Sequence, residues 1–216
     1  MANEQRGFEL LATRDADGLR ALLDSDPAAA EARDSAGVSL LMHTLYHGRR
    51  DLAEAVAGRK LELDVFEAAS MGHLERLQEC LLDPCAVNSY SGDGFTALHF
   101  ACYFGPPDAV RLLLKHGAKA DMVATNAMRV MPLHSAASAR AVEAARLLLE
   151  HGATVNARQH GGWAPIHAAA QNGDLAMVDL LLRYGADPKA ANEDGKTAAV
   201  IARGKGHAEL AARLEG

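Results

Sequence analysis

The sequence has few aromatic residues and no long apolar run. Only 5% of its 216 residues are aromatic, although 49% are hydrophobic, so alanine and leucine must fill most of the interior. This composition favours many small, closely packed helices over one thick core. No apolar stretch approaches the roughly 18 residues that a membrane-spanning helix requires, and we expect no membrane association.

Cysteine is also scarce. The chain has only Cys80, Cys85 and Cys102, and an odd, sparse number argues against a disulfide framework and indicates a reducing compartment. The spacing of Cys80 and Cys85 is poor for metal ligands, with no second pair. The first residues lack the basic segment and apolar run that mark a secretory signal. We therefore expect a cytoplasmic protein.

The chain has no excess of basic charge. Its net charge is −6, and residues 1–90 hold 9 Lys/Arg against 16 Asp/Glu, whereas residues 91–216 hold 13 against 12. An acidic chain disfavours a nucleic-acid backbone as partner. We interpret the acidic first part as a solvated helix surface; a docking surface for a basic partner is the alternative.

The sequence does contain an internal repeat. His99, His134 and His167 stand 35 and then 33 residues apart, and each lies 18 residues before a glycine that follows a leucine-rich block. The constant segment is therefore expected to be a packed helix pair, with length changes in the loop outside it. A fixed period in this range is typical of stacked helical repeats.

These repeats resemble the ankyrin repeat. The segment Met131-Pro132-Leu133-His134 is similar to the Thr-Pro-Leu-His start of its first helix, and Leu112-Leu113-Leu114-Lys115-His116-Gly117-Ala118 to the Leu-Leu-x-x-Gly-Ala end of its second. The resemblance implies an all-α solenoid of about seven stacked helix–turn–helix pairs, with degenerate caps and projecting β-turn or hairpin loops, here called fingers.

We expect one ankyrin-repeat domain over residues 1–216. Its predicted parts are an N-terminal capping pair (1–36), a short repeat without a finger (37–62), four repeats (63–93, 94–128, 129–161 and 162–194) and a C-terminal cap (195–216).

Two places depart from the pattern. Gly48 and Gly72 are only 24 residues apart, against 33 in the next unit, so nine residues are missing near Gly58. We predict a tight helix–helix link there and no finger. The finger between Lys119 and Val130 instead has two extra residues, with Arg129 where others have glycine, and its tip should be irregular.

The ten histidines raise the question of a metal site. Neighbouring repeats lie roughly 10 Å apart, whereas zinc needs ligands at about 2.0–2.1 Å, so His99, His134 and His167 cannot share an ion. The resemblance implies instead that each ties its helix start to the neighbouring loop by hydrogen bonds. His43 and His47 have i,i+4 spacing but lack the glutamate of an H-E-x-x-H frame. We expect no metal and no cofactor.

Catalytic motifs are missing from the sequence. It has no Gly-x-Ser-x-Gly elbow and no Walker loop, and its carboxylates suggest no paired acid and base. The glycine-rich Gly204-Lys205-Gly206 falls at the turn of a repeat. We do not expect an enzyme.

The resemblance also implies a binding surface. In ankyrin repeats, the residue before the Thr and the two before the turn glycine face the concave groove, and these positions hold five of the ten aromatic residues here. Exposed aromatics typically mark a binding patch; packing between fingers and helices is the alternative. The predicted partner-binding residues are Tyr46, His47, Met71, Asp93, Phe95, Tyr103, Phe104, Val130, Trp163, Gln171 and Asn172.

The family's implied activity is protein binding through the groove and loop tips, and we expect a monomeric scaffold for a partner protein. Two alternatives remain open. One is a small-molecule or metabolite-responsive module with Trp163, Phe104 and His160 lining a pocket. The other is an inert accessory subunit of an enzyme.

Overall fold

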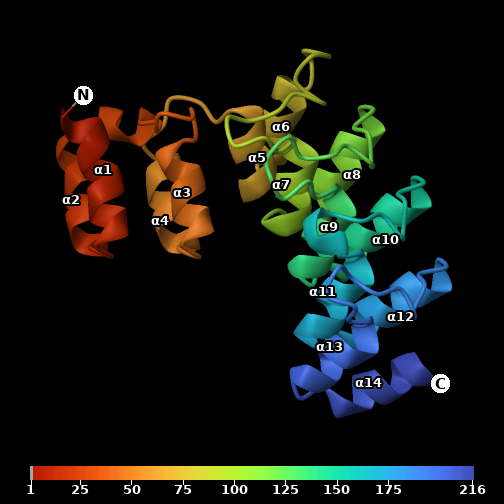
Figure 1. Ribbon diagram of the computed structural model, residues 1–216. Helices are drawn as coiled ribbons and strands as arrows, with labels where there is room; N and C mark the ends of the chain where they lie inside the picture. Colours follow the sequence, from red (N-terminus) through yellow and green to blue (C-terminus); the bar gives the residue numbers. More distant parts are fainter. Residues whose placement is uncertain (1) are drawn as a thin grey trace.

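The computed structural model describes residues 2–216, which form 14 α-helices and no strands (Figure 1). The helices follow one another in pairs, which confirms the all-α solenoid. The pairs are α1 (Ala2–Ala12) and α2 (Ala16–Ser25), α3 (Leu40–Tyr46) and α4 (Arg50–Ala57), α5 (Val65–Met71) and α6 (Leu74–Cys80), α7 (Ala97–Tyr103) and α8 (Pro107–Lys115), α9 (Pro132–Ser138) and α10 (Val142–Glu150), α11 (Pro165–Asn172) and α12 (Leu175–Arg183), and α13 (Ala198–Gly204) and α14 (Ala208–Glu215). Two 3₁₀ helices, η1 (Pro27–Glu31) and η2 (His160–Gly162), lie in the connections.

Local sequence signals fix the starts of these short helices. Pro132 and Pro165 are the first residues of α9 and α11, where a missing N–H costs nothing. The Thr197 hydroxyl accepts a hydrogen bond from Val200 N at 3.4 Å and so caps the start of α13. Such a cap is worth roughly 1 kcal/mol. Helices of this length are marginal alone, so their stability comes from stacking.

Stacking buries leucine and alanine. The inner helices α5, α7, α9, α11 and α13 pack one on the next, and so do the outer helices α6, α8, α10 and α12. Ala101, Ala137 and Ala170 are fully buried on inner helices, because small side chains let the helices approach closely. The resulting stack runs from α5 down to the C-terminus (Figure 1).

Each of five fingers is closed by an equivalent backbone hydrogen bond. In each, the first residue donates its N–H to the carbonyl of the last at 2.8–3.0 Å. Neighbouring fingers are joined in turn, for example Thr125 N to Gly94 O and Glu193 N to Gly161 O, both at 3.0 Å. The fingers are residues 34–38, 91–95, 124–130, 159–163 and 192–196, and in 124–130 the closing bond spans the two extra residues.

The repeated histidines join helices to fingers. His99 accepts a hydrogen bond at Nδ1 from Thr96 N (3.2 Å) and donates from Nε2 to Val130 O (3.1 Å). His134 and His167 likewise accept at Nδ1 from Met131 N and Ala164 N. From Nε2, His134 donates to Ala157 O and Trp163 O, and His167 donates to Ala190 O, just before finger 192–196. The structural role that the family resemblance implied is confirmed.

The stack is interrupted between α4 and α5. Residues 58–64 join the two helices, and within the described chain α3 packs less closely on α5, and α4 on α6, than the later helices pack on one another. Met42 of α3 still meets Ser70 of α5, with Sδ and Oγ 3.5 Å apart. In Figure 1 the helices of the N-terminal unit (residues 2–57) lie to one side of the C-terminal stack (residues 65–215), and one buried core runs through both. Finger 34–38 touches finger 91–95, so closely that a Cβ built on Gly92 would lie 1.7 Å from Ala36 O.

A buried ion pair sits at this junction. The Lys60 side chain is 1% exposed, and its Nζ lies 2.7 Å from Glu31 and 3.4 Å from the fully buried Glu67. Glu67 also accepts a hydrogen bond from Asp64 N at 3.0 Å, as part of a capping box at the start of α5. At this junction Lys60 thus pairs with a carboxylate of the N-terminal unit, Glu31, and with one of the C-terminal stack, Glu67, which also caps α5.

Candidate functional site

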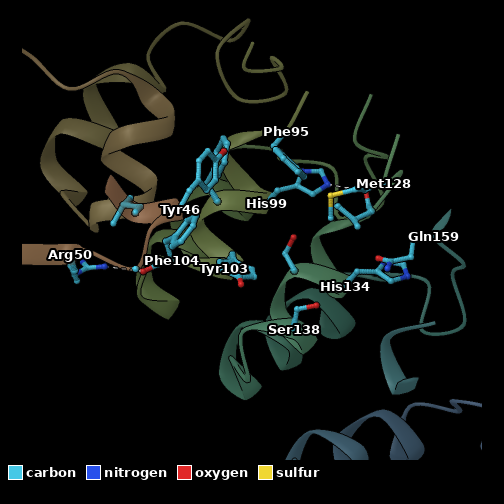
Figure 2. A pocket seen from close by; sticks show the side chains of 15 residues that line it. Tyr46, Arg50, Phe95, His99, Tyr103, Phe104, Met128, His134, Ser138 and Gln159 are labelled. Carbon is cyan, nitrogen blue, oxygen red and sulfur yellow. Dashed lines mark hydrogen bonds between the residues drawn. The ribbon is translucent and has the colours of Figure 1, made fainter. Parts of the chain in front are cut away.

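A pocket of about 620 Å³ opens on the concave side of the stack (Figure 2). Part of its wall comes from the N-terminal unit, at the end of α3 and the start of α4, and the rest from α7, α9 and fingers 91–95, 124–130 and 159–163. Its lining residues are Leu45, Tyr46, Gly48, Arg50, Phe95, His99, Phe100, Tyr103, Phe104, Met128, Val130, His134, Ser135, Ser138 and Gln159. The interrupted stacking therefore creates a hollow where two parts of the chain meet.

Aromatic rings form the wall on the side of the N-terminal unit. Tyr46 lies 5.8 Å from Phe104 and 6.5 Å from Phe100 between ring centroids, and Tyr103 lies 4.7 Å from Phe104. Phe95 packs on Phe100 at 5.6 Å. In Figure 2, Tyr46 and Phe104 face Met128 and Gln159 across the pocket. These rings pack on one another and still leave surface exposed, 49% for Tyr103.

The side chains of Tyr46 and Arg50 make polar contacts between the N-terminal unit and the C-terminal stack. The Tyr46 hydroxyl donates to Asp93, and Asp93 also accepts from the Ser91 hydroxyl at 2.5 Å. The Arg50 guanidinium donates to Phe104 O at 3.1 Å and to Met71 O at 3.0 Å. Tyr46 thus reaches finger 91–95, and Arg50 connects the ends of α5 and α7.

The ionisable groups of the pocket do not suit acid–base chemistry near neutral pH. Burial lowers the pKa of His99 to about 4 and also lowers the pKa of His134. Burial raises the pKa of Tyr46, and the hydrogen bond to Asp93 raises it further. The histidines are therefore neutral and the tyrosine protonated, so the arrangement supports binding of apolar groups beside hydroxyl, amide and guanidinium donors.

The pocket brings together five of the residues that the sequence predicted as partner-binding. These are Tyr46, Phe95, Tyr103, Phe104 and Val130. Asp93 lies behind them as the acceptor for Tyr46. Val130, however, is only 6% exposed, and its carbonyl is taken by His99.

The other predicted residues lie outside the pocket. His47 is exposed and donates from Nδ1 to His43 O at 2.8 Å, while Met71 is only 8% exposed. Asn172 donates from Nδ2 to Ala137 O and Ser138 O. Trp163 is half-buried against His167, with ring centroids 5.8 Å apart, and Gln171 is exposed. Of Phe104, Trp163 and His160, only Phe104 lines the pocket.

Several lining residues were missed by sequence reasoning. Leu45 and Arg50 point to the pocket only because the N-terminal unit contacts α7 across the junction. Met128 belongs to the two-residue insertion in finger 124–130, and Gln159 begins the next finger. Ser138 occupies one of the groove-facing positions of its repeat, and this position in the repeat could have identified it as a lining residue.

Within residues 2–216, the structure places no three His, Cys, Asp or Glu side chains where they could hold a metal ion. The helices it describes include none long and apolar enough to cross a membrane. Cys80, Cys85 and Cys102 are free thiols.

Comparison with known proteins identifies the repeats. A family model described as "Ankyrin repeats (3 copies)" matches residues 65–159, and a model of the single ankyrin repeat matches residues 161–193. These matches cover all of the C-terminal stack except its last helix pair.

Individual relatives share the same repeats. The chain is 36% identical over 155 residues to BCL-6 corepressor-like protein 1 from Homo sapiens, covering 71% of this chain and 7% of that protein. It is 30% identical over 192 residues to ankyrin repeat protein nuc-2 from Neurospora crassa, covering 83% and 18%. It is 39% identical over 113 residues to B-cell lymphoma 3 protein homolog from Mus musculus, covering 52% and 25%. The chain thus spans a quarter or less of the length of these relatives.

Proposed function

Because the chain belongs to the ankyrin repeat family, we propose that it binds a partner protein through its concave groove, with the pocket between the N-terminal unit and α7 as the anchor point. Ankyrin repeats generally mediate protein–protein interaction and form a generally non-catalytic module. The observation that carries the proposal is the open pocket of about 620 Å³ with exposed aromatic rings on one wall.

Tyr103 is the residue on which this proposal depends most. It is the most exposed aromatic side chain of the pocket, and tyrosine anchors at the centre of an interface commonly lose about 2 kcal/mol or more on truncation. Both ring nitrogens of His99 and His134 are engaged by backbone groups, and Asp93 accepts from Tyr46 and Ser91, so none of them is offered to a substrate. We propose accordingly that the chain acts by binding alone, as a cytoplasmic monomer.

A paired substitution tests the proposal. Tyr103→Ala removes a ring from the pocket, and Tyr184→Ala removes a comparably exposed ring, 40% against 49%, from the end of α12. Both variants are used with the wild type as bait in a pull-down from the native source, after circular dichroism has shown that they fold. We expect Tyr103→Ala alone to lose the partner. Equal retention by both variants would place the partner elsewhere and refute the groove.

A second candidate is binding of a small molecule. The pocket volume falls within the 300–1,000 Å³ of ligand sites, which occur preferentially between domains. A thermal-shift screen of metabolites tests it, because a ligand that binds only the folded state raises the melting temperature. A shift that Tyr103→Ala abolishes would favour this function over protein binding.

A further inference from the structure

Three arginines occupy backbone conformations that the rest of the chain assigns to glycine. Arg129 has φ of 51° at the finger position where Gly94 has 86°. Arg140 and Arg14 have φ of 59° and 60° at the turn within a helix pair, where Gly173 has 68°. Residues other than glycine are disfavoured here by about 1–2 kcal/mol, so this strain persists only where something offsets it.

Two of these arginines border the pocket. Arg129 lies between Met128 and Val130, and both neighbours line the pocket. Arg140 follows two residues after Ser138, another lining residue, and donates a hydrogen bond to Asn172 O. Arg129 and Arg140 are both exposed. Arginine at these two positions therefore places positive charge next to residues that line the pocket.

This charge has little internal compensation. In the described part of the chain, neither Arg129 nor Arg140 has a carboxylate within salt-bridge distance, and the nearest one to Arg50 is Glu54 at 3.9 Å. Asp93 is the carboxylate beside the pocket, and Tyr46 and Ser91 already occupy it with hydrogen bonds. Three arginines beside the pocket thus stand against two carboxylates: Asp93, which is already engaged, and Glu54, which lies 3.9 Å from Arg50.

We propose that the pocket takes a linear, acidic segment of a partner protein, in which one bulky apolar side chain enters the pocket and neighbouring carboxylates pair with Arg50, Arg129 and Arg140. This inference rests on the proposed function and specifies the chemistry of its partner. The apolar side chain meets Tyr46, Tyr103 and Phe104.

The polar groups of the pocket fit an extended backbone beside that side chain. Ser135 and Ser138 bring hydroxyl groups from α9, and Gln159 brings an amide from the next finger. Long-range attraction between the acidic segment and the arginines speeds the encounter and weakens as salt screens it. Arginine suits this role because its planar guanidinium binds carboxylates in a bidentate manner.

The test is selection of a phage-displayed library of random linear peptides on the whole chain. We expect enriched peptides to carry a bulky apolar residue flanked by Asp or Glu, and to bind more weakly at higher salt when measured by fluorescence polarisation. A consensus that is basic or lacks a bulky apolar residue would overturn the inference, and so would the absence of any consensus.

Matched variants locate the selected peptide. Arg129→Asn with Arg140→Asn removes both charges and keeps a residue that tolerates the left-handed conformation. We expect affinity to fall roughly threefold to tenfold, as for exposed ion pairs. Arg14→Asn is the control, because it makes the same change at the same kind of turn in the first helix pair. Equal effects from the control and the double variant would refute the arginine pairing.

Filling the pocket supplies the independent check. Ser138 is exposed at the pocket edge, so Ser138→Trp should occupy the hollow without disturbing the core and should weaken peptide binding at least tenfold. Unchanged binding would overturn the inference. If the peptides fail these tests while Tyr103→Ala still loses its partner in the pull-down, the groove binds a protein of different chemistry, and only the further inference fails.

Discussion

Replacing Lys60 by methionine would measure how the N-terminal unit is held on the stack. The Lys60 ammonium lies 2.7 Å from Glu31 and 3.4 Å from Glu67, whose side chains are 43% and 0% exposed. Methionine fills similar space without the charge and leaves Glu67 Oε1, which has no hydrogen-bond partner, without its cation. Breaking a buried ion pair costs about 3–5 kcal/mol. Because Glu31 stays half-exposed, we expect Lys60→Met to lower the free energy of unfolding by about 3 kcal/mol, the lower end of this range.

Urea unfolding followed by two signals measures this cost. Circular dichroism at far-ultraviolet wavelengths reports all helices, whereas the fluorescence of Trp163, the only tryptophan, reports the C-terminal stack. Since the lost contact lies at the junction, we expect the circular dichroism midpoint to fall more than the fluorescence midpoint. The two transitions of the variant should therefore separate.

Two further variants decide the interpretation. Adding Glu67→Gln to Lys60→Met removes the uncompensated charge and preserves the bond to Asp64 N, since glutamine also serves in a capping box; it should recover more than half of the loss. Arg59→Met removes the neighbouring cation, whose partner Asp24 is exposed, and should cost at most about 0.5 kcal/mol. If Lys60→Met costs no more than Arg59→Met, the buried pair does not hold the junction.

Other predictions concern caps, turns and pH. Thr197→Ala should lower the free energy of unfolding by about 1 kcal/mol in thermal melts. Gly94→Ala should cost more than Gly195→Ala in the same assay, because its Cβ would lie 2.5 Å from a side-chain oxygen whereas Gly195 has open space and the same sign of φ. Arg129→Gly should stabilise the chain by about 0.5–1 kcal/mol in urea unfolding and weaken peptide binding. The pKa of His99 is lowered by burial to about 4, below roughly 6.5 in the unfolded chain. The contribution of neutral His99 to the free energy of unfolding is therefore complete above about pH 6.5, and about 3 kcal/mol of it should be lost as the pH falls towards 4. Urea unfolding at several pH values measures this loss. The free energy of unfolding of His99→Gln should depend less on pH over the same range.

Local signals were sufficient for the repeating parts of the fold. Pro165 at a helix start, and Gly185 with φ of 86° at a helix end, each act within a few residues. The role of His167 followed from the family resemblance, because this histidine recurs at the same place in three repeats. The sequence therefore predicted the helix pairs, the fingers and the histidine bonds.

The pocket could be predicted only in part. The place of Tyr103 and Phe104 in the pocket could be predicted from their position in a repeat, but the residues that Tyr46 and Arg50 contact could not. Those partners depend on how two distant parts of the chain meet once the intervening finger is absent. The spacing of Gly48 and Gly72 showed the loss, but not that Ala36 would then lie against Gly92.

The interrupted stacking has a mechanical consequence. In a continuous solenoid, tension between the two ends passes through each interface in turn. Here the N-terminal unit and the C-terminal stack are joined by residues 58–64 and by contacts of Tyr46, Arg50 and Lys60. A pull on the ends would open this junction before the packed helices separate. Because the pocket walls belong to both sides of the junction, the same movement would widen the pocket and release whatever it holds, so that binding here is sensitive to force.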